Sequence, residues 1–513
     1  MAGGFFMELN THICRQLIEK ANAFAQITLD DDYIVRDNKP DVLRIIYSKG
    51  DILLEDIKAG NQAVWITGKL RFDTLYQSDD ENHRLESISG EIPFQEKIIM
   101  DELEDEEVSV NVRLEDLSIG IINSRKLTIR AVLNIWADSR MEAEYAIASR
   151  VLEEEKYEQK ISQLPVMCLL CNEKDVLRIQ KEILLPNSRG NIGEIIFHQV
   201  NFRNEEILLQ GDKVQIQMDV QVWILYRSES NGEYECFETV VPVAGEIECE
   251  NTRGDEVFWS KIVPTEIEIE PRADYDGESR MIGVDMAFSV EIQIYREEMC
   301  ERLVDVYSLD KEVTAIREEL ALNQLLMKNS SKIRLVEQVQ LEKNQERILQ
   351  ICGCNGKIII DRVQKREKGI QVEGIMSVHI IYNTLDDAMP YAHSNSQIAF
   401  DQFVEIEGFT EDSHYLIDDK IEQLQVNLLD NSEYEIKATI QIAVLAMGCE
   451  QIANIVAIEE EPIDMEALQK QPGMIGCIKR KDEDIWDIAK RYHATAENII
   501  EMEDKVLVIK QVR

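Results

Sequence analysis

The sequence predicts a mainly β, multidomain protein, in which three tandem β-rich repeats precede a small C-terminal α+β domain of order βααβ. One pattern of alternating apolar and polar residues, rich in Val, Ile and aromatics, occurs three times, at 64–76, 214–226 and 370–382. Alternation with period two over this length is typical of a half-buried strand. Residues 471–513 differ from the rest, because their eight basic and eight acidic residues cancel and leave the net charge of −43 on residues 1–470.

The three copies extend beyond this strand. Tyr76 lies 150 residues before Tyr226, and the first and third copies share an offset of 306 that relates Gly68 to Gly374. Each unit exceeds 100 residues, which is too long for a solenoid repeat. We therefore expect three copies of one β-domain, forming a rod-like spacer or platform.

Composition shifts and turn residues place the boundaries of these domains. Glu459–Pro462 and Gln469–Gly473 bracket a linker before the neutral C-terminal part. The predicted division is an N-terminal helix plus first β-domain at 1–138, a connector at 139–174, a second β-domain at 175–300, a helical connector at 301–331, a third β-domain at 332–448, a linker at 449–473 and the C-terminal domain at 474–513.

Three segments outside the β-domains are predicted to be helical. Glu8–Ala25 has apolar residues at a spacing of four, from Leu9 onward, and Leu309–Met327 has a comparable apolar stripe. Met141–Leu164 is charged and is expected to form a helical connector.

The C-terminal domain is predicted to begin with a strand at 475–480. A helix follows at 484–492, and Thr495 is placed as the N-cap of a second helix with Glu497 in its first turn. Lys505–Ile509 closes the domain as a strand.

Charge and length exclude several classes of protein. The net charge of −43 argues against a nucleic-acid partner and against direct binding to anionic lipid. No apolar run reaches the roughly 18 residues of a membrane span, and the N-terminus lacks the features of a signal peptide. We therefore expect a cytoplasmic protein whose ten cysteines are thiols.

The chemistry-bearing residues form no constellation in the sequence. Cys168 and Cys171 have the spacing of half a zinc site, but no second pair lies at a matching distance, and Cys352 and Cys354 are too close together. Buried thiols are the favoured interpretation, with metal or redox chemistry as the alternative. The seven histidines are scattered, and no P-loop, nucleophile elbow or dinucleotide fingerprint occurs. We expect no catalytic residue, no metal and no cofactor, and hence no enzyme.

The C-terminal domain resembles the LysM family through Ile485–Tyr492 and Glu497–Ile500, which match that family's two helix patterns. The resemblance implies binding of N-acetylglucosamine polymers. However, the first loop reads Asp482-Glu483-Asp484 instead of Gly-Asp-Thr, the usual Asn is Glu503, and the usual Pro is Ile509. These departures argue against glycan binding. A peptidoglycan-binding LysM protein remains the alternative, and it would need export.

The repeats resemble SPOCS domains of endospore-forming bacteria, because 37–46 matches the Lys-Pro-Asp-Ile entry motif of that family. The second and third copies lack the Lys-Pro-Asp. Tandem SPOCS domains ending in a LysM domain resemble a family of spore-coat morphogenetic proteins. The resemblance implies a non-enzymatic scaffold in the mother-cell cytoplasm at the forespore surface, which binds the ATPase stage IV sporulation protein A and other coat proteins.

We place the partner-binding surface on the LysM-like domain. Rim charges there would steer the approach of the ATPase and aromatic side chains would supply buried area. Trp486 has two alternatives, completion of the small core or partial exposure as an interface anchor. The predicted site comprises Lys481, Asp482, Glu483, Trp486, Lys490, Tyr492 and Glu503.

Overall fold

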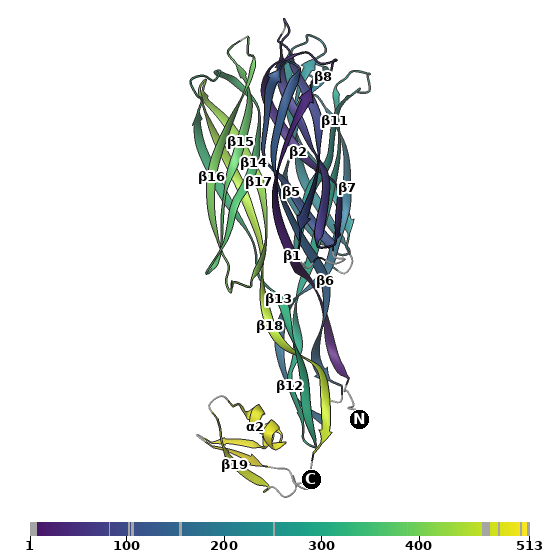
Figure 1. Ribbon diagram of the computed structural model, residues 1–513, viewed down its shortest axis with the longest axis vertical. Helices are drawn as coiled ribbons and strands as arrows, with labels where there is room; N and C mark the ends of the chain where they lie inside the picture. Colours follow the sequence, from purple (N-terminus) through teal and green to yellow (C-terminus); the bar gives the residue numbers. More distant parts are fainter. Residues whose placement is uncertain are drawn as a thin grey trace.

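A broad head of β-sheet continues into a narrow stalk, with a small module beside the free end of the stalk (Figure 1). The stalk is the part formed by residues 9–18, 140–151, 157–169, 295–308, 311–325 and 447–462. The computed structural model describes residues 8–81, 83–100, 103, 107–152, 156–249, 252–386, 388–463, 472–480, 483–502 and 505–509.

The three repeats share one topology of six strands in two three-stranded antiparallel sheets. The first repeat contains β1 (Leu9–Ile34), β2 (Val42–Gly60), β3 (Ala63–Ser78), β4 (Leu85–Ile99), β5 (Glu107–Asn123) and β6 (Lys126–Val151). The second contains β7 (Tyr157–Leu184), β8 (Ile192–Gln210), β9 (Lys213–Ser228), β10 (Tyr234–Glu248), β11 (Val257–Arg272) and β12 (Met281–Ser308). The third contains β13 (Lys311–Gln340), β14 (Ile348–Arg366), β15 (Gly369–Thr384), β16 (Tyr391–Glu405), β17 (His414–Asp430) and β18 (Glu433–Pro462).

Each repeat is a sandwich of these two sheets. A three-strand meander, such as β2-β3-β4, faces a sheet in which the first strand pairs with the last, as in β1-β6-β5. The alternating pattern that the sequence shows three times forms the central strand of each meander, β3, β9 and β15. Val64, Ile66 and Phe72 of β3 are at most 1% exposed, so one face of the strand lies in the core. The expected repetition of a β-domain is confirmed.

The aligned tyrosines close the entry turn of each repeat. Tyr76 Oη donates to the carbonyl of Pro40 at 3.1 Å, Tyr226 to that of Gly190 at 3.3 Å, and Tyr382 to that of Glu346 at 3.1 Å. Donors and acceptors are related by the same offsets of 150 and 306 residues. The Lys-Pro-Asp motif of the first copy is thus part of a turn that all three repeats keep.

The repeats pack side by side around one shared cluster. Leu75, Leu225 and Ile381 occupy equivalent positions and are all buried in it. Leu85 N donates to Tyr234 Oη at 2.9 Å between the first and second repeats. Trp223 Nε1 donates to Cys352 O at 2.7 Å between the second and third, and Arg44 Nη2 donates to Tyr391 O at 2.7 Å between the first and third. Each repeat therefore contacts both others.

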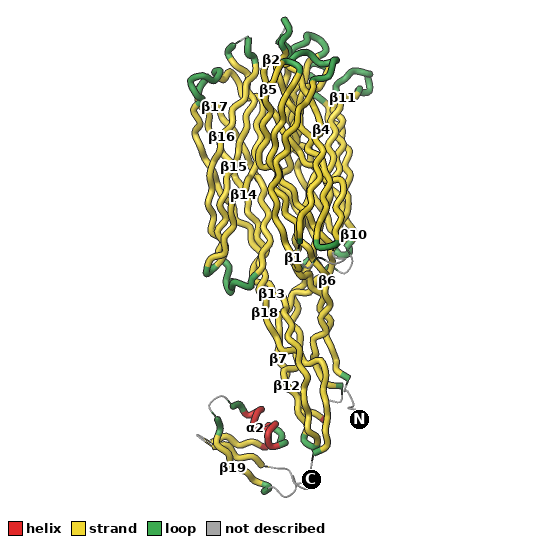
Figure 2. The backbone as a smooth tube through the Cα atoms, viewed as in Figure 1, coloured by secondary structure: helices red, strands yellow, loops and turns green. Residues whose placement is uncertain are grey.

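The three predicted helices are wrong, because strands take their place: β1 covers 9–25, β6 covers 141–151, β7 covers 157–164 and β13 covers 311–327 (Figure 2). A spacing of four fits a strand as well as a helix, since every even spacing lies on one face of a strand. In β1 the opposite face is the buried one, with Cys14 fully buried and Ile13 54% exposed. Three two-stranded ribbons, β1/β6, β7/β12 and β13/β18, thus form the stalk.

The C-terminal module consists of β19 (Met474–Ile478), α2 (Ile485–Tyr492), the 3-10 turn η2 (Ala496–Asn498), β20 (Ile499–Met502) and β21 (Lys505–Ile509). The strand order is β19-β21-β20. The predicted second helix is wrong: a single 3-10 turn leads into a strand, and the Thr495 side chain makes no capping hydrogen bond. The βααβ order is therefore not confirmed. Among the described residues, no helix has the length and apolar character needed to cross a bilayer.

The prediction that all cysteines are thiols is wrong for two of them. Cys171 on β7 and Cys249, which follows β10, form a disulfide with a Cα–Cα distance of 6.5 Å. The two strands belong to opposite sheets of the second repeat, so the sequence separation of 78 residues gives no local sign of the pairing. The other eight cysteines are free thiols.

Candidate functional site

Helix α2 of the module carries most of the predicted site, and its two ends are capped. Asp484 accepts a hydrogen bond from Asp487 N at 2.9 Å, and the Asp487 carboxylate accepts one from Asp484 N at 3.0 Å. This reciprocal pair is a capping box. The left-handed conformation of His493 (φ 48°) ends the helix. Ile488 and Ala489 are fully buried against the sheet of the module.

The opposite face of α2 packs on the end of the stalk, in a contact that we call the latch. The latch joins Asp305, Tyr307 and Ser308 of β12 to Trp486, Lys490, His493 and Ala494 of the module. Trp486 Nε1 donates to Asp305 Oδ2 at 2.8 Å, and Lys490 Nζ lies 2.7 and 2.8 Å from the two Asp305 oxygens. The indole meets the Tyr307 ring edge to face, with centroids 4.8 Å apart.

Further contacts extend the latch on both sides. Tyr307 Oη donates to Ala494 O at 2.8 Å, and His493 Nδ1 lies 3.0 Å from Ser308 O. Burial raises the pKa of the Tyr307 hydroxyl, which therefore stays a donor at neutral pH. At the edge, Lys160 on β7 pairs with Asp484 at 2.6 Å. The module is held by aromatic, charged and backbone contacts at once.

Asp305 is the electrostatic centre of the latch. Burial alone would raise the pKa of this carboxyl, but hydrogen bonds from Lys490 and Trp486 outweigh burial and hold the pKa below its usual value of 3.8. Arg317 on β13 adds a second cation at 2.9 Å. At neutral pH, Asp305 is therefore an anion with three donors, and charge-assisted bonds of this kind are the stronger ones.

The predicted site residues do not gather on one free surface. Trp486 and Lys490 lie together in the latch. Tyr492 packs against the module core, and Glu483 forms an ion pair with Arg491. Lys481, Asp482 and Glu503 lie outside the described residues. Asp305 and Tyr307 were missed by sequence reasoning, because nothing near them in the sequence distinguishes them from other strand residues.

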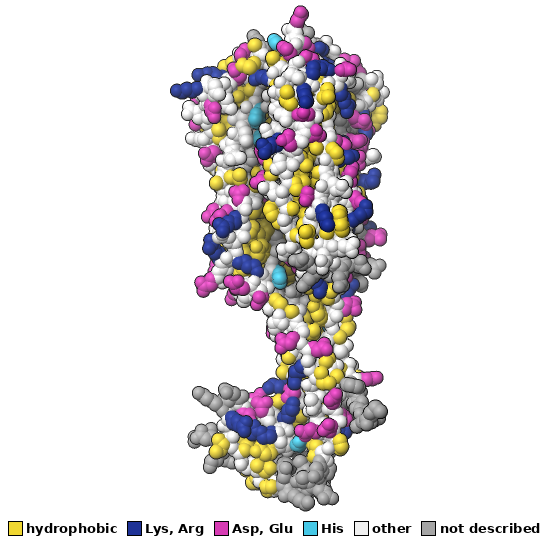
Figure 3. Space-filling model, in the orientation of Figure 1, with side chains coloured by type: hydrophobic (Ala, Val, Ile, Leu, Met, Phe, Trp, Pro, Cys, Tyr) yellow, Lys and Arg dark blue, Asp and Glu magenta, His cyan; other side chains and the backbone are white. Residues whose placement is uncertain are grey.

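The module has a second face, which the sequence did not indicate. Ile475 and Cys477 of β19 point into the module core, so alternation turns their neighbours outward. Met474 is 58% exposed, Ile478 74% and Ile500 45%. Figure 3 shows hydrophobic side chains on the lower part of the module. We call this surface the outer sheet face, and it lies across the sheet from the helix that contacts the stalk.

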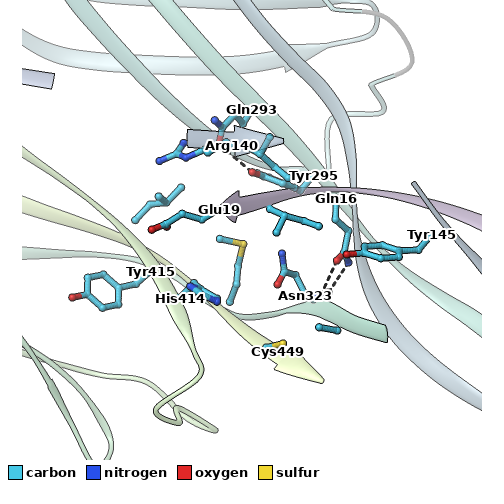
Figure 4. A pocket seen from close by; sticks show the side chains of 15 residues that line it. Gln16, Glu19, Arg140, Tyr145, Gln293, Tyr295, Asn323, His414, Tyr415 and Cys449 are labelled. Carbon is cyan, nitrogen blue, oxygen red and sulfur yellow. Dashed lines mark hydrogen bonds between the residues drawn. The ribbon is translucent and has the colours of Figure 1, made fainter. Parts of the chain in front are cut away.

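A cavity of about 140 Å³ lies where the stalk meets the head (Figure 4). Its wall includes the buried side chain of Gln16 on β1. Gln16 Nε2 donates to Met167 O at 3.2 Å and to Asn323 O at 3.3 Å, and Gln16 Oε1 accepts from Asn323 N at 3.0 Å. One amide thereby connects all three repeats.

The fold and the module together define a tandem β-sandwich protein with an appended α/β module. Residues 41–122 and 347–429 match the family model described as SipL, SPOCS domain. The resemblance of the first and third repeats to SPOCS domains is thus confirmed, and the chain is similar to SipL in carrying this domain in tandem. No match was found among curated proteins or solved structures.

The two matched regions begin 306 residues apart, in agreement with the offset between the first and third copies. They span β2–β5 and β14–β17, whereas the long stalk strands β1, β6, β13 and β18 lie outside them. The second repeat is not in a matched region but has the same strand order. The SPOCS match links the chain to sporulation, and the LysM resemblance of the module stays a prediction.

Proposed function

We propose that the protein is a non-enzymatic sporulation scaffold of the mother-cell cytoplasm. Its C-terminal module docks on the forespore-coating ATPase, stage IV sporulation protein A, while the repeats help to anchor and assemble coat proteins at the forespore surface. The observation that carries the proposal is the SPOCS match in two of three packed repeats. It is supported by the position of the module at the free end of the stalk, remote from the head (Figure 1).

We assign the ATPase contact to the outer sheet face of the module. Trp486 and Lys490, which the sequence favoured, make their contacts with the stalk instead. Met474, Ile478 and Ile500 remain exposed, and exposed apolar patches mark interaction sites. The C-terminal module has no net charge, whereas the repeats are strongly acidic. An acidic partner would be repelled by the repeats but not by the module.

The test compares full-length protein with three variants for binding to the purified ATPase by biolayer interferometry. Deletion of residues 464–513 should abolish binding, and Ile478→Glu should weaken it at least tenfold because it places a charge in an apolar contact. Ile99→Glu is the matched control, since Ile99 in the head is 72% exposed and Ile478 74%. It should leave affinity unchanged.

Two results would contradict the proposal. Undiminished affinity after the deletion would remove the module from the interaction. Saturable binding of N-acetylglucosamine oligomers by full-length protein, lost with the deletion, would favour the glycan-binding alternative.

A further inference from the structure

Three strands bring metal-ligating side chains together inside the stalk. The ligand atoms of His12 on β1, Cys168 on β7 and Glu298 on β12 all lie within 4.8 Å of one another. His12 Nε2 is 3.4 Å from Glu298 Oε2. These residues are at least 130 positions apart in the sequence, so only the fold assembles them.

Two further thiols border the same group. Cys14, two residues after His12, is fully buried and packs in the same hydrophobic cluster as Cys168. Cys300 lies two residues beyond Glu298 and is 3% exposed. Residues two apart on a strand point to the same face, so β1 and β12 each place a thiol beside a member of this group.

The register explains why Cys168 and Glu298 meet. Cys168 pairs with Arg296, and Val166 pairs with Glu298, so the thiol and the carboxylate are diagonal neighbours on one face of the β7/β12 ribbon. The His12 Nε2 atom is buried, and it faces the Glu298 carboxylate at 3.4 Å.

We propose that this group is a Zn²⁺ site with His12 Nε2, Cys168 Sγ and a Glu298 oxygen as its protein ligands. Thiolate and imidazole are the ligands that zinc prefers, and with three protein ligands a water would complete its tetrahedral coordination. One thiolate and one carboxylate balance the double positive charge of the ion. Cys171 is not in this group, and its sulfur lies against that of Cys249.

The ion would fasten the first repeat to the second. β1 belongs to one ribbon of the stalk and β7/β12 form another. A bound ion stabilises the folded state by mass action, because the unfolded chain holds no preformed site. Zinc should therefore raise the thermal midpoint of the body of three repeats.

The experiment uses reduced full-length protein loaded with one equivalent of Zn²⁺ or Co²⁺. Native mass spectrometry should show one zinc per chain, and the cobalt form should show the thiolate-to-cobalt absorption and visible bands of a tetrahedral site. Cys168→Ser should lower zinc affinity at least 100-fold. Cys477→Ser, in the module, is the matched control and should keep both stoichiometry and spectrum.

His12→Gln keeps the proposal testable if Cys168→Ser fails to fold, because His12 is only half-buried. It should weaken zinc binding while the cobalt–thiolate bond persists. Absence of bound zinc in the loaded wild-type protein would overturn the proposal, as would unchanged binding by Cys168→Ser. A Cys14–Cys168 disulfide in protein kept under cytosolic thiol reductant would overturn it too.

Discussion

Replacement of Gln16 by leucine should destabilise the whole body of three repeats. Gln16 is 1% exposed, and its side-chain amide donates hydrogen bonds to Met167 O and Asn323 O and accepts one from Asn323 N. Leucine has a similar volume but leaves these three backbone groups without their partner. Each buried polar group left unpaired costs about 1–3 kcal/mol, but water in the adjoining cavity can satisfy part of the loss. We expect a loss of about 3 kcal/mol in the free energy of unfolding.

The measurement is urea unfolding followed by far-UV circular dichroism, with Gln26→Leu as the control. Gln26 lies on the same strand but is exposed, and it bonds only to the side chains of Glu115 and Asn134. Gln16→Leu should move the unfolding midpoint to lower urea concentration in a single transition, since each repeat contacts both others. Equal midpoints for the two variants would refute the reasoning. A separate early transition of one repeat would show that the repeats are not coupled.

Three further predictions concern the latch, pH and the module core. Asp305→Asn should weaken the latch, because the neutral amide loses its charge-assisted bonds to Lys490 and Arg317. Hydroxyl-radical footprinting should then show several-fold more oxidation of Trp486. The control is Glu312→Gln, which removes an exposed ion pair with His493 at the rim and should change this oxidation little. Burial raises the pKa of Glu256, but hydrogen bonds from Arg296 and from the Gly254 and Arg253 amides prevail and lower it from 4.5 to about 2. This carboxylate therefore stabilises the fold above pH 4.5, and its contribution is lost as pH falls toward 2, so thermal midpoints of the wild type should fall more steeply over that range than those of Glu256→Gln. Ile488→Asp should unfold the module by burying an unpaired charge, whereas Lys490→Glu should only open the latch. The measurement is amide hydrogen exchange of α2. Retained protection of α2 in Ile488→Asp would contradict this prediction.

The repetition of the fold could be predicted because its signal is local. In β3, β9 and β15 the side chains alternate between a buried and an outer face, and the same alternation of apolar and polar residues is visible in the sequence. The equivalent tyrosines, Tyr76 and Tyr226, kept their spacing because both close the same turn. These features depend on residues near one another in the chain.

The stalk could not be predicted in the same way, because its signals are ambiguous or distant. Leu9, Ile13 and Leu17 share a face in a helix and in a strand, and only pairing with β6 decides between them. The latch likewise depends on Asp305, which is 181 residues from Trp486. No pattern within either segment identifies the other.

Joining three copies in one chain permits asymmetry that three separate chains could not have. Equivalent residues such as Leu75, Leu225 and Ile381 still meet at one cluster in the head. The free ends of the three stalk ribbons are not equivalent. The connection between β12 and β13 links the second repeat to the third, and the single module folds back on that side through Asp305. Three identical chains would carry three modules, whereas this arrangement presents one outer sheet face per body of three repeats.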